Sequence, residues 1–203
     1  MKIIYRGAEA ILYSEKIDGR KIVVKERIKK GYRIPVLDDR IIKRRTKREE
    51  SLLNRAQRNG VTVPKVLGVE SSKIFMEFVD GKKVKDVLNN LSSDDRNNVY
   101  ELIGKEIASL HNANIIHGDL TTSNFILTDK KLFVVDFGLG KYSERVEDQA
   151  VDLYVLYEAL KAAHFKYLNH AWQNILKSYS YSYSNAKTVL NRIEKIKKRR
   201  RYK

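Results

Sequence analysis

Residues 117–124 read HGDLTTSN, and residues 132–138 read LFVVDFG. In the first stretch Asp119 precedes Asn124 by five positions, on a loop that we expect between buried strands. Phosphoryl transfer uses this arrangement: the aspartate orients the attacking hydroxyl or accepts its proton, and the asparagine oxygen takes a magnesium ion. In the second stretch Asp136 follows an apolar run, where its carboxylate can bridge Mg²⁺ to the β- and γ-phosphates of ATP. Together the two stretches predict a kinase-like, ATP-dependent phosphotransferase.

A lysine and a glutamate upstream complete the predicted phosphate site. The strand-like segment IVVK ends in Lys25, the place of the kinase lysine that contacts the α- and β-phosphates. Its glutamate partner should come from the next helix, where TKREESLL offers Glu49 and Glu50. Adjacent helical residues face about 100° apart, so only one can point inward. We choose Glu49 as the partner and expect Glu50 to face solvent.

Other positions fit the remaining parts of an ATP site. Gly7 lies in RGAEAILY, where most kinases carry three glycines over the phosphates. FMEFVDG fits the hinge between two lobes, where the backbone of Glu77 and Val79 would hydrogen-bond adenine. Asp152 has two interpretations: it accepts backbone N–H groups of the catalytic loop, or it is an ordinary acid near a helix start.

The pattern along the chain predicts an α+β, bilobal, kinase-like fold with two lobes sharing a cleft. Residues 1–25 alternate as three antiparallel strands, with Asp18 and Gly19 as a hairpin turn. After a charged stretch containing Pro35, we expect one main helix at about 41–59. Two more strands then complete a five-stranded antiparallel sheet.

The second lobe is predicted to be short and mostly helical. Ser92 or Ser93 can cap one helix, another should run from about 147 to 164, and a last one from 185 into the tail. We interpret SYSYSYS, residues 178–184, as a loop. The predicted domains are a first lobe at 1–79 with a basic insert at 26–48, a reduced second lobe at 80–190 and a basic tail at 191–203.

Charge is concentrated in two places. The net charge is +16, and residues 20–48 hold 13 basic and 3 acidic residues, a net of +10. Residues 191–203 hold 8 basic and 1 acidic residue, a net of +7, so the remainder is close to neutral. Two basic patches indicate a polyanionic partner.

Cysteine usage and hydropathy exclude several classes of protein. The chain has no cysteine, which excludes disulfides, thiolate zinc sites and cysteine nucleophiles. No run approaches the roughly 20 apolar residues of a membrane span, and the start is too quickly polar for a secretory signal. We therefore expect a cytoplasmic protein that does not contact a membrane.

Several segments resemble one family over nearly the whole chain: GAEA, IVVK, RIPVLDDRI, RTKREE, FMEFVDG, HGDLTTSNFIL and VEDQAVDLYVLYEAL. They resemble the small RIO-like atypical Ser/Thr kinase of the KEOPS complex, of the archaeal type. That family also lacks two of the usual glycines and has a shortened second lobe. The resemblance implies an ATPase and Ser/Thr phosphotransferase that uses ATP and Mg²⁺. It implies Asp119, Asn124 and Asp136 as catalytic and magnesium residues, and Lys25 and Glu49 as the pair that positions ATP.

The resemblance also implies partners. The family works with a metal-dependent tRNA-modifying enzyme and the small subunits of KEOPS in making threonylcarbamoyladenosine (t6A) in tRNA. We expect tRNA to meet the basic insert and the tail. In some relatives the kinase is fused behind its partner enzyme, whereas this chain begins at Met1 with the first strand, so we expect it to be free-standing.

Two other functions stay open. Small-molecule kinases of the aminoglycoside or sugar type also carry HGD followed by Asn, although their second lobe is usually longer. A kinase-shaped scaffold with idle chemistry is the other alternative, and the intact catalytic residues argue against it. The phosphate acceptor is also open: water, a partner, or the protein itself, for which Tyr142 and Ser143 are candidate sites.

Overall fold

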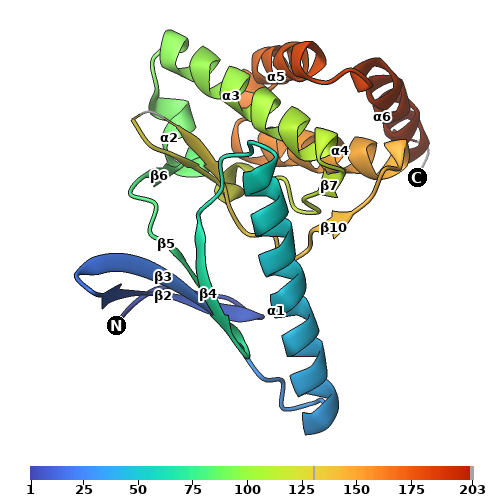
Figure 1. The fold of residues 1–203 in the computed structure, drawn as a ribbon. Coiled ribbons are helices and arrows are strands. Elements are labelled where there is room, and N and C mark those ends of the chain that lie inside the picture. Colours follow the sequence, from blue (N-terminus) through green and yellow to red (C-terminus); the bar gives the residue numbers. More distant parts are fainter. Residues whose placement is uncertain (130, 202–203) are drawn as a thin grey trace.

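The first lobe is a five-stranded antiparallel sheet in the order β1-β2-β3-β5-β4, with the long helix α1 beside it (Figure 1). The computed structural model describes residues 1–129 and 131–201, and side chains up to residue 198. Asp18 and Gly19 both have positive φ, 49° and 75°, as a tight hairpin turn requires. The five-stranded antiparallel sheet and the presence of one main helix after its third strand are as predicted. The elements are β1 (Lys2–Arg6), β2 (Ala10–Ile17), β3 (Arg20–Arg27), α1 (Pro35–Arg58), β4 (Val66–Glu70) and β5 (Lys73–Glu77).

Helix α1 begins at Pro35, so the start predicted at about residue 41 is wrong. Proline suits the first helical position, because its fixed φ is already helical and the N–H it lacks would have no partner there. Asp38 in the first turn is buried and accepts hydrogen bonds from Lys30 N at 2.8 Å and Arg33 Nη1 at 3.0 Å. The basic region at 26–48 therefore comprises the end of β3, a short fastened loop and the first half of α1.

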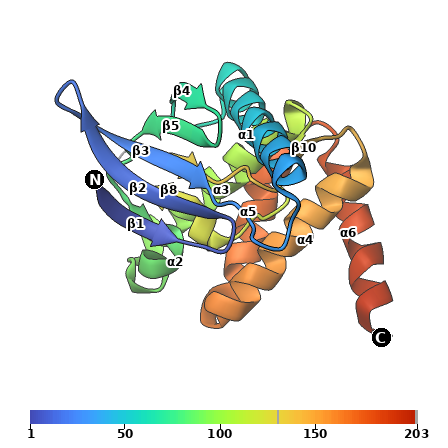
Figure 2. The same ribbon diagram turned by 90° about the horizontal axis from the view of Figure 1, so that it is seen from below.

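The second lobe is mostly helical, as expected, and its helices gather on one side of the sheet lobe (Figure 2). Its small sheets have the orders β6-β8-β9 and β10-β7. Ser92 caps α3 by accepting a hydrogen bond from Asp95 N at 3.1 Å. The elements are β6 (Lys82–Lys83), α2 (Val84–Val87), η1 (Leu88–Asn90), α3 (Ser93–Asn112), β7 (Ile115–Ile116), η2 (Thr122–Asn124), β8 (Phe125–Leu127), β9 (Leu132–Val134), β10 (Lys141–Tyr142), α4 (Val146–Ala163), η3 (Phe165–Tyr167), α5 (Leu168–Ser182) and α6 (Ala186–Arg201).

Helix α5 continues through most of SYSYSYS, so the loop predicted at 178–184 is wrong. Burial in this segment follows the period of a helix and not the alternation of Ser and Tyr. Trp172, Ile175 and Tyr179 are buried at spacings of three and four residues. A β-carbon on Gly104 of α3 would lie 2.5 Å from the carbonyl oxygen of Ile175. The two helices therefore pack in direct backbone contact, and this tertiary packing overrides the local sequence signal.

The last helix, α6, is packed into the fold rather than extending from it. Its residues Val189, Ile193 and Ile196 are buried, and the helix lies against α4. The predicted helix from 185 into the basic tail is confirmed, and residues 202 and 203 of that tail lie outside the described residues.

One hydrophobic core runs through both lobes. Leu52 of α1 and Ile74 of β5 belong to the same buried cluster as Ile107, Leu120 and Leu153 of the second lobe. This shared core fixes the lobes against each other at the place where the catalytic residues were predicted. Within the described part of the chain, no helix combines the length and the apolar character needed to cross a membrane.

Candidate active site

The predicted catalytic loop lies between β7 and β8, and Asp119 and Asn124 are in direct contact on it. The amide nitrogen of Asn124 donates to the Asp119 carboxylate and to the Asp119 carbonyl oxygen, both at 2.9 Å. Because these bonds engage the nitrogen, the amide oxygen of Asn124 is the atom left to bind a metal.

Asp152 of α4 holds this loop from beneath, so the first of its two interpretations is confirmed. Its carboxylate oxygens accept hydrogen bonds from His117 N at 2.7 Å and from Gly118 N at 2.8 Å. Gly118 has φ +81°, and a β-carbon there would lie 2.6 Å from the Leu139 carbonyl oxygen. The loop therefore needs both the buried carboxylate and a glycine at this position.

The side chain of His117 ties the catalytic loop to the DFG segment. Its Nδ1 accepts a hydrogen bond from Asp119 N at 3.3 Å, which leaves the proton on Nε2, and Nε2 donates to Val135 O at 3.0 Å. The ring also lies 4.9 Å from the ring of Phe137, measured between centroids. Val135 N in turn donates to Asn124 O at 2.9 Å. The two motifs found in the sequence are thus fastened side by side.

Lys25 connects the first lobe to the DFG segment. Its Nζ lies 2.6 Å from Glu49 Oε1 and 2.7 Å from Asp136 Oδ1, so the predicted pairing with Glu49 is confirmed. Burial by itself lowers the pKa of Lys25, but the carboxylates of Glu49 and Asp136 outweigh it and raise the pKa above its usual value. Lys25 is therefore a cation over the whole neutral range.

Asp136 is the second carboxylate of the site. Its φ of +66° lies in the left-handed region that residues other than glycine seldom adopt, a strain typical of functional positions. Burial favours the protonated acid, but the charge and hydrogen bond of Lys25 and the Gly138 N–H reverse this and lower the pKa of Asp136. At neutral pH it is an ionised oxygen donor.

These donors fit magnesium. Mg²⁺ usually takes one or two carboxylates and completes its shell with water and substrate phosphates. Asn124 and Asp136 offer hard oxygens of this kind. Among the described residues, no three or more His, Cys, Asp and Glu side chains form a group able to hold a metal ion. Magnesium binding at Asn124 and Asp136 therefore remains a prediction that relies on phosphate oxygens as further ligands.

The predicted adenine and phosphate-loop residues lie on the expected elements of the first lobe. Gly7 N donates to Ala10 O at 2.9 Å and closes the turn between β1 and β2. Glu77 ends β5, and its N–H is already bonded to Lys65 O at 2.9 Å, so a hydrogen bond to adenine would use its carbonyl. Val79 is half-buried and lies just beyond the strand. Nucleotide contact by these three residues stays a prediction.

Sequence reasoning missed Arg27, which is a second cation paired with Glu49 beside Lys25. Its Nη2 lies 2.5 Å from Glu49 Oε2, and only 5% of its side chain is exposed. A signal was available, because alternate residues of a strand share a face and Arg27 follows Lys25 by two positions.

Sequence reasoning also missed a buried polar group behind Asp152. His111 Nε2 lies 3.6 Å from Asp152 Oδ2, and His111 Nδ1 is hydrogen-bonded to the Tyr179 hydroxyl at 2.8 Å. Burial raises the pKa of Tyr179 far above its usual value. No sequence pattern marks this group, because its members come from helices distant in the chain.

Comparison with known proteins places the chain. A family model described as RIO domain matches residues 16–152. The KEOPS complex subunit Bud32 of Pyrococcus abyssi is 38% identical, covering 100% of this chain and 97% of that protein. The EKC/KEOPS complex subunit bud32 of Dictyostelium discoideum is 39% identical, covering 99% of this chain and 83% of that one.

A longer relative and a solved structure extend this comparison. A probable bifunctional tRNA threonylcarbamoyladenosine biosynthesis protein of Methanosarcina barkeri is 39% identical over 99% of this chain, which spans 36% of that protein. The structure of WaaP in complex with acyl carrier protein aligns with TM-score 0.70 at 16% identity, covering 98% of this chain and 88% of that one. That likeness concerns the kinase-like fold. The family match and the full-length relatives show that the chain belongs to the RIO-domain family, among the relatives of the KEOPS subunit Bud32.

Proposed function

We propose that the protein is a Mg-ATP-dependent atypical Ser/Thr kinase and ATPase that works in a KEOPS complex and supports t6A modification of tRNA. The names of the relatives from Pyrococcus abyssi, Dictyostelium discoideum and Methanosarcina barkeri support the complex and the modification. The tRNA-modifying metalloenzyme of that complex and its small subunits are the proposed partners, and the cytoplasm is the proposed location.

The observation that carries this proposal is the joining of three catalytic parts. Lys25 pairs with both Glu49 and Asp136, and Asp119 contacts Asn124 on a loop that the DFG segment adjoins. Phosphoryl transfer depends mainly on positioning and on electrostatic stabilisation, and this arrangement provides both.

Each residue has a defined part in the proposed reaction. Asp119 would take the proton of the attacking hydroxyl or water. The oxygen of that hydroxyl or water would bond to the γ-phosphorus while the bond to ADP breaks and ADP leaves. Lys25 would hold the α- and β-phosphates, and Glu49 would keep Lys25 in place. Asn124 and Asp136 would hold Mg²⁺, which when bound neutralises charge on the phosphate oxygens.

The two basic regions differ in what they can offer to tRNA. On α6, Arg192 is ion-paired with Glu147 and Lys197 lies 4.2 Å from the Tyr157 ring centroid, whereas Lys195 and Lys198 are exposed. On α1 the exposed cations are Arg40, Lys43, Arg44, Lys47, Arg48 and Arg58. Contacts from these exposed groups to phosphates would add affinity and salt dependence without reading sequence.

ATP turnover tests the proposal. It would be measured with Mg²⁺, with and without tRNA and the partner enzyme, for the wild type and for Asp119→Ala and Asp136→Ala. Asp94→Ala, an exposed aspartate at the start of α3, is the matched control. We expect both site variants to lose at least about 100-fold in turnover, and tRNA or partner to stimulate the wild type. Equal, near-background turnover in all four proteins would instead favour a scaffold with idle chemistry.

Among the residues that the structure describes, no observation favours a small-molecule kinase. A hollow of about 830 Å³ opens between the hinge end and α3, lined among others by Asp80, Leu102 and Asp129. None of the predicted catalytic residues lines it, so it is not a cup for an acceptor beside Asp119. Specific turnover of an aminoglycoside or a sugar would nevertheless revive that alternative.

A further inference from the structure

A row of alternating charges runs from the outside of α1 to the DFG segment. Each member lies within 4 Å of the next: 3.9 Å between Arg27 and Glu9, and shorter at every other step. The row crosses the nucleotide loop of residues 7–9, strand β3 and the buried face of α1. Its members, in order, are Arg45, Glu9, Arg27, Glu49, Lys25 and Asp136.

Arg27 is the central member, and the row explains its burial. A buried cation is costly unless it is paired, and Arg27 has only Glu49 and Glu9 as carboxylate partners among the described residues. Its Nε has no hydrogen-bond partner there. Glu49 is 2% exposed and gives one oxygen to Lys25 and the other to Arg27. Without Arg27, one buried carboxylate oxygen of the catalytic pair would lose its partner.

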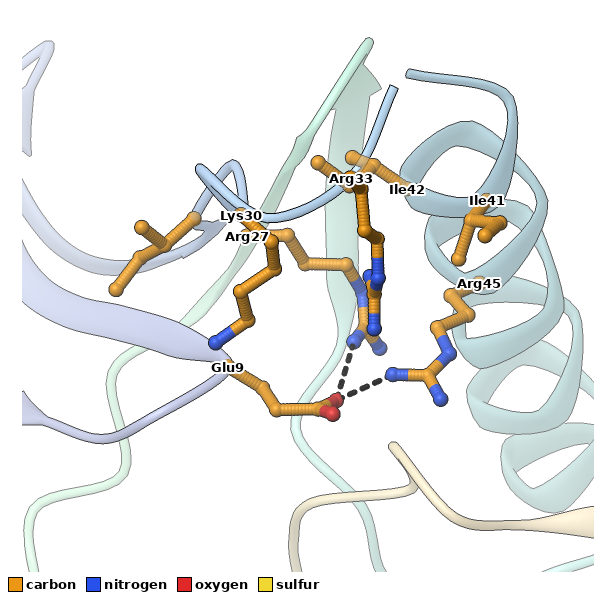
Figure 3. A pocket seen from close by; sticks show the side chains of 8 residues that line it. Glu9, Arg27, Lys30, Arg33, Ile41, Ile42 and Arg45 are labelled. Carbon is orange, nitrogen blue, oxygen red and sulfur yellow. Dashed lines mark hydrogen bonds and ion pairs between the residues drawn. The ribbon is translucent and has the colours of Figure 1, made fainter. Parts of the chain in front are cut away.

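Glu9 brings the nucleotide loop into this row (Figure 3). Its carboxylate faces a pocket whose other charged lining residues are all cations: Arg27, Lys30, Arg33 and Arg45. The cavity left among them is about 10 Å³, roughly room for one water, so the Glu9 carboxylate is the anion that this pocket holds. The hydrogen bond from Arg45 lowers the pKa of Glu9, which therefore stays ionised at neutral pH.

The backbone of the loop is fastened at the same place. Ile28 N donates to Glu9 O at 3.1 Å, and Lys30 Nζ donates to Ala8 O. Kinases with three glycines place a flexible loop over the phosphates. In this chain Gly7 stands alone, and charged contacts from β3 and α1 set where the loop tip lies.

We propose that Arg27 is a positioning residue for the nucleotide, and that Glu9 and Arg27 act as one latch between the nucleotide loop and the Lys25–Glu49 pair. With the latch closed, the loop covers the phosphates while Glu49 keeps Lys25 directed at them. This inference rests on the proposed ATP-dependent function. It concerns residues that neither touch the transferred phosphoryl group nor take part in proton transfer.

A double-mutant cycle in the intact chain tests the latch. Glu9→Gln removes the carboxylate charge, and Arg27→Lys keeps the charge but loses the planar fork that reaches Glu9 and Glu49 together. Glu101→Gln is the matched control, since it removes a similarly exposed carboxylate from an ion pair with Lys105 on α3. The readouts are the dissociation constant of Mg-ATP by calorimetry, KM and kcat for ATP, and the melting temperature.

We expect each single variant to weaken Mg-ATP binding and raise KM about three- to tenfold, with kcat changed less than twofold. This follows if loop closure governs nucleotide retention. The double variant should bind Mg-ATP no more weakly than Arg27→Lys alone, because both changes open the same latch. The melting temperature of Glu9→Gln should stay at the wild-type value, and Glu101→Gln should match the wild type throughout.

Other outcomes overturn the latch. If the fold-changes in the Mg-ATP dissociation constant of the two single variants multiply in the double variant, Glu9 acts independently of Arg27. A lowered melting temperature with unchanged nucleotide affinity would make Arg27 purely structural. A wild type that binds Mg-ATP without turnover would contradict the proposed function, while the affinity cycle would still decide the latch. A wild type that does not bind Mg-ATP would overturn both.

Discussion

Replacing the buried aspartate beneath the catalytic loop should damage stability and turnover together. Asp152 is fully buried and gives one carboxylate oxygen to each of two backbone N–H groups, those of His117 and Gly118. In Asp152→Asn one oxygen remains as an acceptor, while the new amide nitrogen faces the other N–H. One charge-assisted hydrogen bond is lost, which costs about 1.5–3 kcal/mol.

The expected size of this effect can be measured directly. In a chain of this length 1 kcal/mol shifts the melting temperature by about 2–4 °C, so Asp152→Asn should melt about 3–12 °C lower. Turnover should fall at least about tenfold, because a displacement near 1 Å in the loop misplaces Asp119. Thermal unfolding and ATP hydrolysis are the two assays. Glu158→Gln, which removes the same charge from the same helix, should leave both readouts near wild type.

Two results would refute this reasoning. If Asp152→Asn melts within about 1 °C of the wild type, the two short hydrogen bonds contribute nothing measurable to stability. If it melts lower but keeps full turnover, the loop does not depend on Asp152 for its catalytic shape. In that case its burial would serve packing with His111 alone.

Two further outcomes are expected. Because the folded-state pKa of Asp136 is lowered, its pair with Lys25 stabilises the fold above the unfolded value of about 4, and that stability is lost as pH falls through the lowered pKa. Denaturant unfolding should therefore show the wild type more stable than Asp136→Asn between pH 5 and 8, with the difference shrinking below about pH 4; a difference independent of pH would contradict the ion pair. If the basic patches meet tRNA phosphates, Lys195→Gln with Lys198→Gln, or Lys43→Gln with Lys47→Gln, should each lower the slope of log K against log salt by about 1.5 without changing Mg-ATP affinity. Unchanged slopes would remove that patch from the tRNA surface, and lost ATP affinity would show that it serves the nucleotide.

Local spacing predicted which residues of the candidate site meet, because the chemistry fixes residue types at short distances along the chain. The Asp119–Asn124 contact and the choice of Glu49 over Glu50 both follow from loop length and helical geometry. What spacing could not reveal are contacts between distant segments. Glu9 meets Arg27 and Arg45 only after the sheet and α1 assemble, and His111 reaches Tyr179 only because α3 and α5 pack closely.

The two errors in secondary structure have different origins. The sequence predicts a charged stretch containing Pro35 before the helix, although proline at the first helical position begins a helix. In α5 the Ser and Tyr residues of 178–184 predict a loop, but burial of Tyr179 against α3 decides the conformation. The basic tail is a similar case, because Ile193 and Ile196 belong to the core. Deleting residues 192–203 would therefore confound RNA binding with unfolding, and the lysine variants above avoid this.

Helix α1 is held in its inward position by contacts that need no modified residue. The Ser51 hydroxyl is hydrogen-bonded to the Tyr142 hydroxyl at 2.9 Å, and Arg55 Nε donates to Ala113 O at 2.9 Å. Leu52 packs closely on Gly140: a β-carbon added to Gly140 would lie 2.8 Å from Leu52 Cδ1. These contacts join α1 to the segment after DFG and to the second lobe. Buried residues of α1 and of the second lobe also belong to one hydrophobic core. Because Glu49 lies on this helix, its pairing with Lys25 is part of the folded structure and requires no phosphorylated activation loop.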